Sequence, residues 1–399
     1  MPARSGAIDR ASVARDAAAF VREHAGAIGR LRVVAGFDGA VDSIIRVVDT
    51  RQSRESFTPM RSMRQFAQRV ESQVGRSINV EFVVEQVKIG GNGPLFANPF
   101  TLWGAKVAYI GALLADPDAP VSKGSDAARM THPVFDEFVS RCDRVYPIAG
   151  PALSDACEFS DGKVIIGKTA AQDAVSWEGV LDALGGAEGA VRLFGGASLF
   201  APMNWTMISS MTEIWRSLAR DILPAIGADE RPRVFVDLAD PAKRSDDDLH
   251  AAIDALRALD ELTPVALGCN FSESARLARA LGATLPDDED DLGSRAEAMR
   301  GALGLSTVCV HTRRAAGASD ESGRVHLDAA FTSDPAISTG AGDTFNAGFA
   351  LGQMLGAPIA QRVAMGVANS GFYVRSRKPP SLEELASFLD DLPEPDAAS

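Results

Sequence analysis

The sequence predicts an α/β fold in which a mostly parallel β-sheet lies between two layers of helices. Short apolar runs alternate with helical stretches along most of the chain, which is typical of parallel strands joined by crossover helices. Two β-like insertions interrupt this alternation in the first half of the chain. Near the C-terminal end, a glycine-rich turn leads into a nearly all-apolar helix within 337–356.

The expected strands of the large sheet are short apolar runs bounded by polar or glycine residues. In chain order they are LRVVAGF (31–37), KVAYIGAL (106–113), VRLFGGA (191–197), RVFVDLAD (233–240), PVALGCN (264–270) and TVCVHT (307–312). Helices are expected between the later strands, at 205–223 and 247–260. Because parallel strands are buried on both faces, helices should cover both sides of the sheet.

The two insertions predict a small β lid over the open edge of the sheet. The first, near 50–88, holds a polar helical piece and the strand-like run NVEFVVEQVKI (79–89). The second, near 155–168, contains Asp161-Gly162, a strong signal for a hairpin turn. The alternative is that both are surface decoration with no role in closing over a substrate.

Three regions follow from this reading. Residues 1–30 form a helical extension with an amphipathic surface helix, residues 31–392 form the main domain, and residues 393–399 form a flexible tail. The first residues carry charges throughout, which argues against a signal peptide. No run of about 18 apolar residues predicts a membrane span.

Composition narrows the possible partners. The formal net charge is −13, and an acidic surface repels nucleic acids and anionic membranes. The four cysteines are far apart, with no metal-ligand spacing, and are expected to be thiols in a reducing compartment. We therefore expect a cytoplasmic protein that binds a small molecule and neither nucleic acid nor membrane.

The segment 338–343, STGAGD, carries the most chemical information. A small-residue turn that leads into a buried helix exposes unpaired backbone amides and the positive end of the helix dipole, which together form an anion site. Asp343 in the same turn is suited to accept the proton of an attacking hydroxyl while the amides hold a migrating phosphoryl group. The helix N-terminus should keep Asp343 ionised. The alternative is a helix-capping aspartate without a chemical role.

Other nucleotide-binding classes lack their motifs. A dinucleotide-dependent oxidoreductase needs GxGxxG after the first strand, where this chain has AGFDGAVDS. A P-loop protein needs GxxxxGK[ST], which does not occur.

TGAGDTFNAGF (339–349) resembles the C-terminal signature of PfkB-family carbohydrate kinases. Other short motifs follow in family order between about 31 and 376: GFDGAVD (36–42), GGNG (90–93), FVDLADP (235–241) and NFSE (270–273). The resemblance implies a ribokinase-like three-layer α/β/α fold with a small β lid. It also implies transfer of a phosphoryl group from ATP, with Mg²⁺, to a hydroxyl of a sugar or sugar-like molecule.

The resemblance assigns roles to individual residues. The catalytic group would be Asp343 as base with Gly340, Ala341 and Gly342 lining the anion hole. Substrate would be bound by Asp42 or Asp38, of which we favour Asp42, together with Gly90, Gly91 and Asn92. The nucleotide would be bound near Asn270, Glu273, Thr312, Gly317 and Asn369. Glu273 would also hold Mg²⁺, through water, and a helix cap is the alternative for this NxxE motif.

Two departures from the family pattern leave alternatives open. Arg314 stands where the nucleotide loop usually has its first glycine, so the loop differs, or the arginine serves the nucleotide or is merely solvated. The spacing to Asn98 also resembles the ADP-dependent branch of the superfamily, although TGAGDTF favours ATP. A non-catalytic sugar- or nucleotide-binding regulator on the same fold is the non-enzyme alternative.

We also expect that two copies of the chain form a homodimer through the lid.

Overall fold

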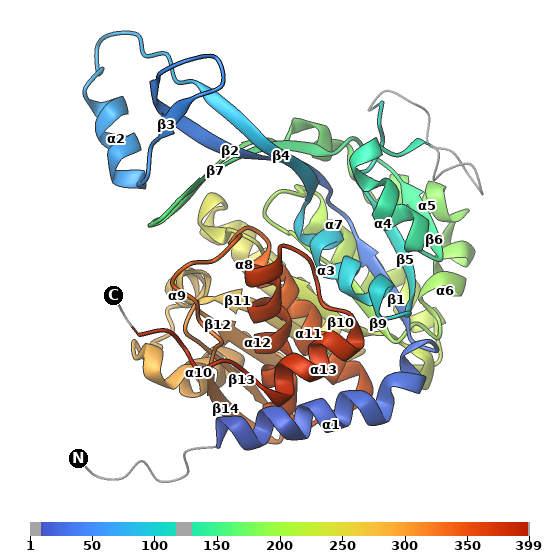
Figure 1. Ribbon diagram of the computed structural model, residues 1–399. Helices are drawn as coiled ribbons and strands as arrows, with labels where there is room; N and C mark the ends of the chain where they lie inside the picture. Colours follow the sequence, from blue (N-terminus) through green and yellow to red (C-terminus); the bar gives the residue numbers. More distant parts are fainter. Residues whose placement is uncertain (1–8, 117–129, 398–399) are drawn as a thin grey trace.

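A nine-stranded sheet forms the middle layer of the protein (Figure 1). The computed structural model describes residues 9–116 and 130–397. The strands of the large sheet are β1 (Arg32–Gly36), β5 (Lys106–Gly111), β6 (Arg144–Pro147), β9 (Leu199–Pro202), β10 (Arg233–Asp237), β11 (Val265–Asn270), β12 (Thr307–His311), β13 (Ala315–Asp320) and β14 (Gly323–Asp328). Their order is β14-β13-β12-β11-β10-β9-β1-β5-β6, parallel from β12 to β6, with β13 and β14 antiparallel at one edge.

Helices cover both faces of this sheet, and one further helix, α2, lies beside a smaller sheet. They are α1 (Arg10–Ile28), α2 (Met63–Glu71), α3 (Asn92–Leu102), α4 (Asp136–Arg141), α5 (Trp177–Leu184), α6 (Ala187–Phe194), α7 (Met211–Ser217), α8 (Asp246–Asp260), α9 (Phe271–Leu281), α10 (Leu292–Leu303), α11 (Ala341–Leu355), α12 (Ile359–Ser376) and α13 (Leu382–Asp390). Helices α5 to α10 share one hydrophobic core with the sheet, and α1, α3, α4, α11, α12 and α13 share another. Within β1, Val34 points into the first core while Val33 and Ala35 point into the second. The predicted three-layer architecture is therefore confirmed.

A smaller sheet stands apart from the large one, at the top of Figure 1. Its strands are β2 (Ala40–Arg51), β3 (Phe57–Pro59), β4 (Phe82–Gly90), β7 (Ala152–Phe159) and β8 (Gly162–Lys168). Strand β2 pairs with β4 in antiparallel and with β7 in parallel orientation, which joins the two insertions into one surface. The predicted hairpin is present, because β7 and β8 pair around Asp161. The small sheet begins at Ala40, ten residues before the insertion near 50–88.

Five of the six expected strands of the large sheet are present, and the prediction for 191–197 is wrong. The run VRLF lies in α6, where Ala190, Leu193 and Phe194 are buried at helical spacing and Arg192 is exposed. The strand follows at β9. A short apolar run does not distinguish a buried helix from a strand by itself.

The helix expected at 205–223 begins later than predicted, at Met211. The backbone amides of Asn204 and Thr206 donate to carbonyls of Asp237 and Leu238, at the end of β10. These bonds hold the segment before α7 at the edge of the sheet, where it forms a single turn, closed by the Ile208 amide and the Asn204 carbonyl, that does not continue into the helix.

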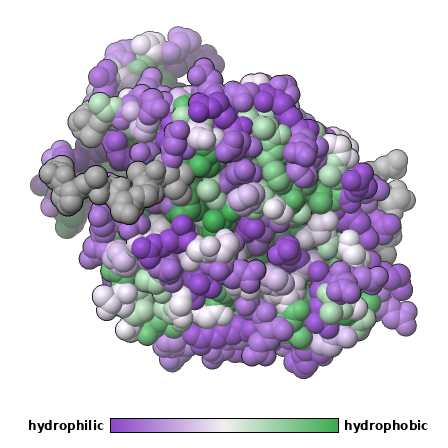
Figure 2. All heavy atoms as spheres, turned by 90° about the horizontal axis from the view of Figure 1, so that it is seen from below, coloured by the Kyte–Doolittle hydropathy of each residue, from purple (hydrophilic) through white to green (hydrophobic). Residues whose placement is uncertain are grey.

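Helix α1 and the described part of the C-terminal segment pack on the main domain. Helix α1 packs on α12 and α13 and buries Ala14, Ala17 and Val21. The surface on this side is mostly hydrophilic (Figure 2). In the C-terminal segment, Asp396 accepts hydrogen bonds from the amide and hydroxyl of Ser333. The predicted extension and tail also include 1–8 and 398–399, which lie outside the described residues. No helix in the described ranges is long and apolar enough to cross a bilayer.

Candidate active site

The glycine turn before α11 exposes backbone amides at a helix N-terminus. Gly340 has a φ of +93°, and a Cβ there would come within 3.0 Å of neighbouring side chains. The Ala341 amide donates to the Ser338 carbonyl over 3.3 Å. Among the described residues, the amides of Gly342 and Asp343 have no hydrogen-bond acceptor. The turn therefore offers two free donors next to the Asp343 carboxylate, as an anion hole requires.

Asp343 is buried, with 8% of its surface exposed. The Asn92 side-chain amide donates to Asp343 Oδ1 over 2.8 Å. Burial, and then the nearby Asp237 carboxylate, raise the pKa of Asp343 well above 3.8, while Asn92 and Lys163 act in the opposite direction. This shift opposes the one expected from the helix N-terminus alone. A raised pKa makes Asp343 a stronger base than an ordinary aspartate.

The GGNG turn places Asp42 beside the site. A Cβ on Gly90 would lie 2.2 Å from Asp42 Cγ, so only glycine leaves room for this carboxylate. Gly91 has a φ of +92° and is the N-cap residue of α3. Asn92 follows, and its side chain points to Asp343. The same turn therefore positions both predicted acids. Gly90 leaves room for the Asp42 carboxylate, and Asn92 holds Asp343 by a hydrogen bond.

Asp38 holds the start of α3. Its carboxylate accepts hydrogen bonds from the Asn92 amide at 2.8 Å, from the Gly93 amide at 2.7 Å and from the Asn204 side chain at 2.8 Å. It has no exposed surface, and burial raises its pKa to about 6 although all three bonds act in the opposite direction. Asp38 is thus completely buried and engaged in holding α3, and the geometry favours Asp42 of the two candidates.

Asn270 and Glu273 form a capping box at the start of α9. The Asn270 side chain accepts from the Glu273 amide at 2.9 Å, and Glu273 accepts from the Asn270 amide at 2.8 Å and from its side chain at 2.6 Å. The helix-cap alternative is therefore realised. Burial, followed by repulsion from Asp237, raises the pKa of Glu273 well above 4.5, and Asp343 contributes in the same direction.

This group of carboxylates suits a cation that is not bound directly. Asp237 raises the pKa of both Glu273 and Asp343, and Asp343 raises that of Glu273, so a nearby positive charge would stabilise the ionised forms of Glu273 and Asp343. No cluster of three or more His, Cys, Asp or Glu side chains in the described ranges is arranged to ligate a metal ion. The donor set fits a divalent cation held through water.

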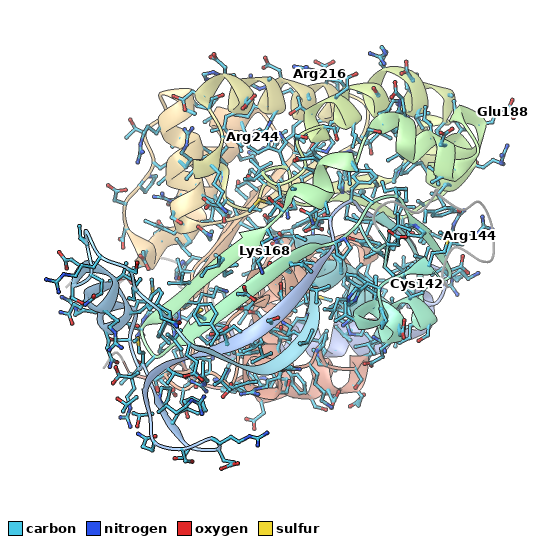
Figure 3. All side chains as sticks on the ribbon, turned by 90° about the horizontal axis from the view of Figure 1, so that it is seen from above. Cys142, Arg144, Lys168, Glu188, Arg216 and Arg244 are labelled. Atoms are coloured by element: carbon cyan, nitrogen blue, oxygen red, sulfur yellow. The ribbon has the colours of Figure 1, made fainter. Side chains whose placement is uncertain are left out.

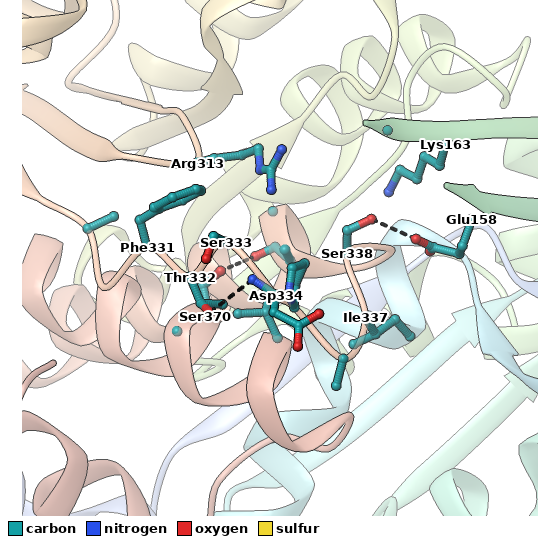
Figure 4. Close-up of a pocket in the computed structure, with 18 of the residues that line it drawn as sticks. Glu158, Lys163, Arg313, Phe331, Thr332, Ser333, Asp334, Ile337, Ser338 and Ser370 are labelled. Carbon is teal, nitrogen blue, oxygen red and sulfur yellow. Dashed lines mark hydrogen bonds between the residues drawn. The ribbon is translucent and has the colours of Figure 1, made fainter. Parts of the chain in front are cut away.

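A cleft of about 1140 Å³ opens between the small sheet and the turn before α11. Thr312 lies on its wall and accepts hydrogen bonds from the amides of Arg314 and Ala315. The guanidinium of Arg314 lies 4.0 Å from the Phe331 ring centroid and that of Arg313 lies 5.4 Å from it, on the same wall (Figure 4). The Arg314 side chain is exposed to solvent and stacks on an aromatic ring of the cleft wall.

Gly317 and Asn369, both predicted to bind the nucleotide, lie in packed parts of the fold. Gly317 lies within β13, where a Cβ would come 2.2 Å from the Leu292 backbone. Asn369 is completely buried and donates to the Thr344 carbonyl over 2.6 Å. Neither residue is part of the cleft wall. Both residues contribute to packing, of β13 on α10 and of α12 on α11, and their assignment to the nucleotide stays a prediction.

The sequence reasoning missed three residues of the small sheet. Lys88 Nζ donates to the Tyr373 hydroxyl over 3.0 Å, and Lys163 Nζ donates to Thr339 Oγ1 over 3.3 Å. Glu158 accepts hydrogen bonds from the Ser338 hydroxyl at 3.0 Å and the Thr339 hydroxyl at 2.7 Å. For Lys163, its place directly after the Asp161-Gly162 turn is the one available sequence signal.

A family model described as prokaryotic ketohexokinase matches residues 9–392. The chain belongs to this family. It is a carbohydrate kinase, as the PfkB-like motifs implied. A curated ketohexokinase of Haloferax volcanii is 29% identical over 359 residues, which are 90% of each protein.

Solved structures show the fold of this kinase. A nucleoside kinase of Methanocaldococcus jannaschii, described as an archaeal member of the ribokinase family, is similar with a TM-score of 0.55 at 13% identity. Arabidopsis thaliana ribokinase, complexed with ribose and ATP, is similar with a TM-score of 0.56 at 15% identity. Each comparison covers 90% of this chain and 98% of the other. The fold is that of ribokinase.

Proposed function

We propose that this carbohydrate kinase transfers the γ-phosphoryl group of ATP to a hydroxyl of a ketohexose. The observation that carries the proposal is the buried Asp343 next to the free amides of the α11 turn, in a chain matched by the ketohexokinase model over nearly its full length. The name of the Haloferax volcanii relative supports the same substrate class.

The proposed reaction uses Asp343 as base and the α11 turn as anion hole. The sugar oxygen forms a bond to the γ-phosphorus, the bond from that phosphorus to the bridging oxygen breaks, and ADP leaves with the electron pair. Asp343 accepts the hydroxyl proton, which its raised pKa favours. The amides of Gly342 and Asp343 stabilise the oxygens of the transferring group. Asp42 orients the sugar by accepting hydrogen bonds from other hydroxyls.

Mg²⁺ fits the nucleotide side of the site. Bound there, it would neutralise charge on the ATP phosphates. Asn270 and Glu273 would hold it through water, and the repulsion among Glu273, Asp237 and Asp343 is the observation that supports this role. Thr312 and the stacked Arg314 would line the nucleotide cleft.

An assay of phosphoryl transfer separates this proposal from its alternatives. Purified protein is given ATP or ADP, Mg²⁺ and one of a panel of ketohexoses, aldohexoses and pentoses, and sugar phosphate is measured directly. We expect turnover with ATP and ketohexoses such as fructose. Turnover with ADP alone would identify an ADP-dependent kinase, and binding of sugar without turnover would identify a regulator. Asn98, whose spacing suggested ADP, accepts a hydrogen bond from Arg141 and is not part of the cleft wall.

We also propose that two copies pair through the small sheet. Its strands expose large apolar side chains that a second copy would cover. They are Val84, Val87, Leu153, Ile165 and Ile166, each between 41% and 55% exposed. Sedimentation of the wild type and of Val84→Glu tests this, and a wild-type monomer at micromolar concentration would contradict it.

A further inference from the structure

The two lysines of the small sheet reach into the active site. Figure 4 shows Lys163 extending from its strand toward the segment that contains Ser338. Its Nζ atom lies 3.3 Å from Thr339 Oγ1, one residue before the glycine turn. Lys163 also lies close enough to Glu158, Asp343 and Asp42 to interact with each of these carboxylates.

Lys88 approaches the same space from β4. Its Nζ atom donates to the Tyr373 hydroxyl, which itself donates to the Thr339 carbonyl over 2.8 Å. Lys88 also interacts electrostatically with Asp42 and Asp343. Both lysines therefore interact with the acid proposed for the sugar and with the proposed base.

Both ammonium groups share their space with the Asp42, Asp343 and Glu158 carboxylates, so a phosphoryl group that enters this space would need the two lysines as its cationic contacts. Burial lowers the pKa of Lys88 and of Lys163, while Asp42 and Asp343 act in the opposite direction. The hydroxyls of a sugar are neutral and do not require two ammonium groups for binding. The γ-phosphoryl group is anionic, and its charge is spread over three oxygens as it moves between ATP and the sugar, so two ammonium groups can stabilise it.

We propose that Lys163 and Lys88 are catalytic residues that the lid presents to the transferring phosphoryl group. The anion hole binds this group from the side of α11, and the lysines bind it from the side of the small sheet. Proton transfer is left to Asp343, and the lysines keep their protons throughout. This inference rests on the proposed kinase function and adds a cationic half to its anion hole.

Glu158 fixes the position of Lys163 in this arrangement. It lies near the end of β7 and bonds the hydroxyls of Ser338 and Thr339, while Lys163 lies near the start of β8. The β7–β8 hairpin is thus bonded to two adjacent residues, Ser338 and Thr339, just before the glycine turn. The movement that closes the small sheet over the site therefore also brings the Lys163 ammonium group to the phosphoryl group. As a result, the charge of the phosphoryl group is fully stabilised only when water is excluded.

The competing explanation is that Lys163 merely balances the charge of Glu158 and Asp42. Substitution by methionine separates the two roles, because it keeps most of the aliphatic stem and removes the charge. Lys163→Arg keeps the charge. Lys168→Met is the matched control, since Lys168 lies on the same strand, is exposed and pairs with Asp155 (Figure 3).

We expect Lys163→Met to lower kcat about 10²- to 10³-fold, the range for losing one donor to transition-state charge, with the KM for ATP little changed. Lys88→Met should behave in the same way, and Lys163→Arg should be faster than Lys163→Met. Lys168→Met should retain wild-type kcat. Wild-type kcat in Lys163→Met, or an equal loss in Lys168→Met, would overturn the proposal.

Binding of a transition-state analogue gives a readout that needs no turnover. ADP with aluminium fluoride and fructose mimics the transferring phosphoryl group, and its affinity is compared with that of ADP alone. In Lys163→Met the analogue should lose affinity while ADP does not. An equal loss for both ligands would show that Lys163 has only a structural role. If the wild type phosphorylates no sugar at all, the proposed function is wrong. If the wild type is active and Lys163→Met has the same kcat and the same affinity for the analogue, only this inference is overturned.

Discussion

The Asn92 side chain donates a 2.8 Å hydrogen bond to the carboxylate of Asp343, 251 residues further along the chain. Asn92 begins α3, and Asp38 holds the first amides of that helix. The glycine turn before α3 therefore orients Asp343 in the glycine turn before α11. This hydrogen bond connects the proposed sugar site with the proposed phosphoryl site, and Asp343 lies where the two sites meet.

Replacement of Asp343 by asparagine tests its role as base. Asp343→Asn should lower kcat by about 10²- to 10⁴-fold, because the amide cannot accept the proton, and ATP affinity should change little. The melting temperature should not fall, since the variant removes repulsion with Asp237. Steady-state kinetics, calorimetric ATP binding and thermal denaturation provide the three measurements. Turnover at the wild-type rate would rule out Asp343 as the base.

Glu273→Gln separates metal binding from helix capping. Glutamine at this position still accepts a hydrogen bond from Asn270, so most of the capping box is kept while the negative charge is lost. The Mg²⁺ concentration for half-maximal rate should therefore rise, with a small change in melting temperature. Asn270→Ala is the comparison, since it removes the cap and should lower stability by about 1 kcal/mol. An unchanged Mg²⁺ titration with a lower melting temperature would leave capping as the role of Glu273.

The pH dependence of kcat/KM should report the raised pKa of Asp343. A base must be unprotonated to act, so activity should increase with pH through this pKa, at values well above 3.8. Asp343→Asn should lose this acid limb, and Lys163→Met should move it to higher pH because the lysine lowers the pKa. The charged groups near Asp343 are Asp38, Lys88, Lys163, Asp237 and Glu273. An acid limb below pH 4 would contradict the assignment.

Much of the fold follows from local patterns in the sequence. Buried strands such as RVFVD and TVCVH are short apolar runs, and their alternation with helices predicts a parallel sheet. Asp343 and Asn270 could be found because each lies in a short motif at the start of a helix. The carboxyl ends of parallel strands meet at one edge, which brings such motifs together.

The lid residues could not be placed in the same way. Lys88 and Lys163 enter the site because β2 pairs with β4 on one side and β7 on the other, joining segments about 70 residues apart. Pairing between strands that are far apart in the sequence produces no local sequence pattern from which it could be predicted. The contact of Asn369 could not be predicted either, because its side chain bonds the Thr344 carbonyl between two helices.

We predict that lid closure depends on the hydrogen bonds that Glu158 accepts from Ser338 and Thr339, and Glu158→Ala tests this. The variant loses two hydrogen bonds to a charged group, each worth about 1.5–3 kcal/mol, so the closed lid should be less populated. The KM for the sugar should rise and the ratio of ATP hydrolysis to sugar phosphorylation should increase, because water enters an open site. ATP affinity should change less than the sugar KM.

Hydrogen exchange measures the lid directly. In the wild type, exchange in β4 and in the β7–β8 hairpin should slow when fructose and a non-hydrolysable ATP analogue are added. The slowing should be smaller in Glu158→Ala. Asp155→Ala is the matched control, since Asp155 lies on the same strand and pairs with the exposed Lys168, so its exchange should follow the wild type. If the exchange rates in both lid segments are unchanged by the ligands while exchange in the turn at 340–343 slows, the small sheet is a surface feature that does not close over the sugar.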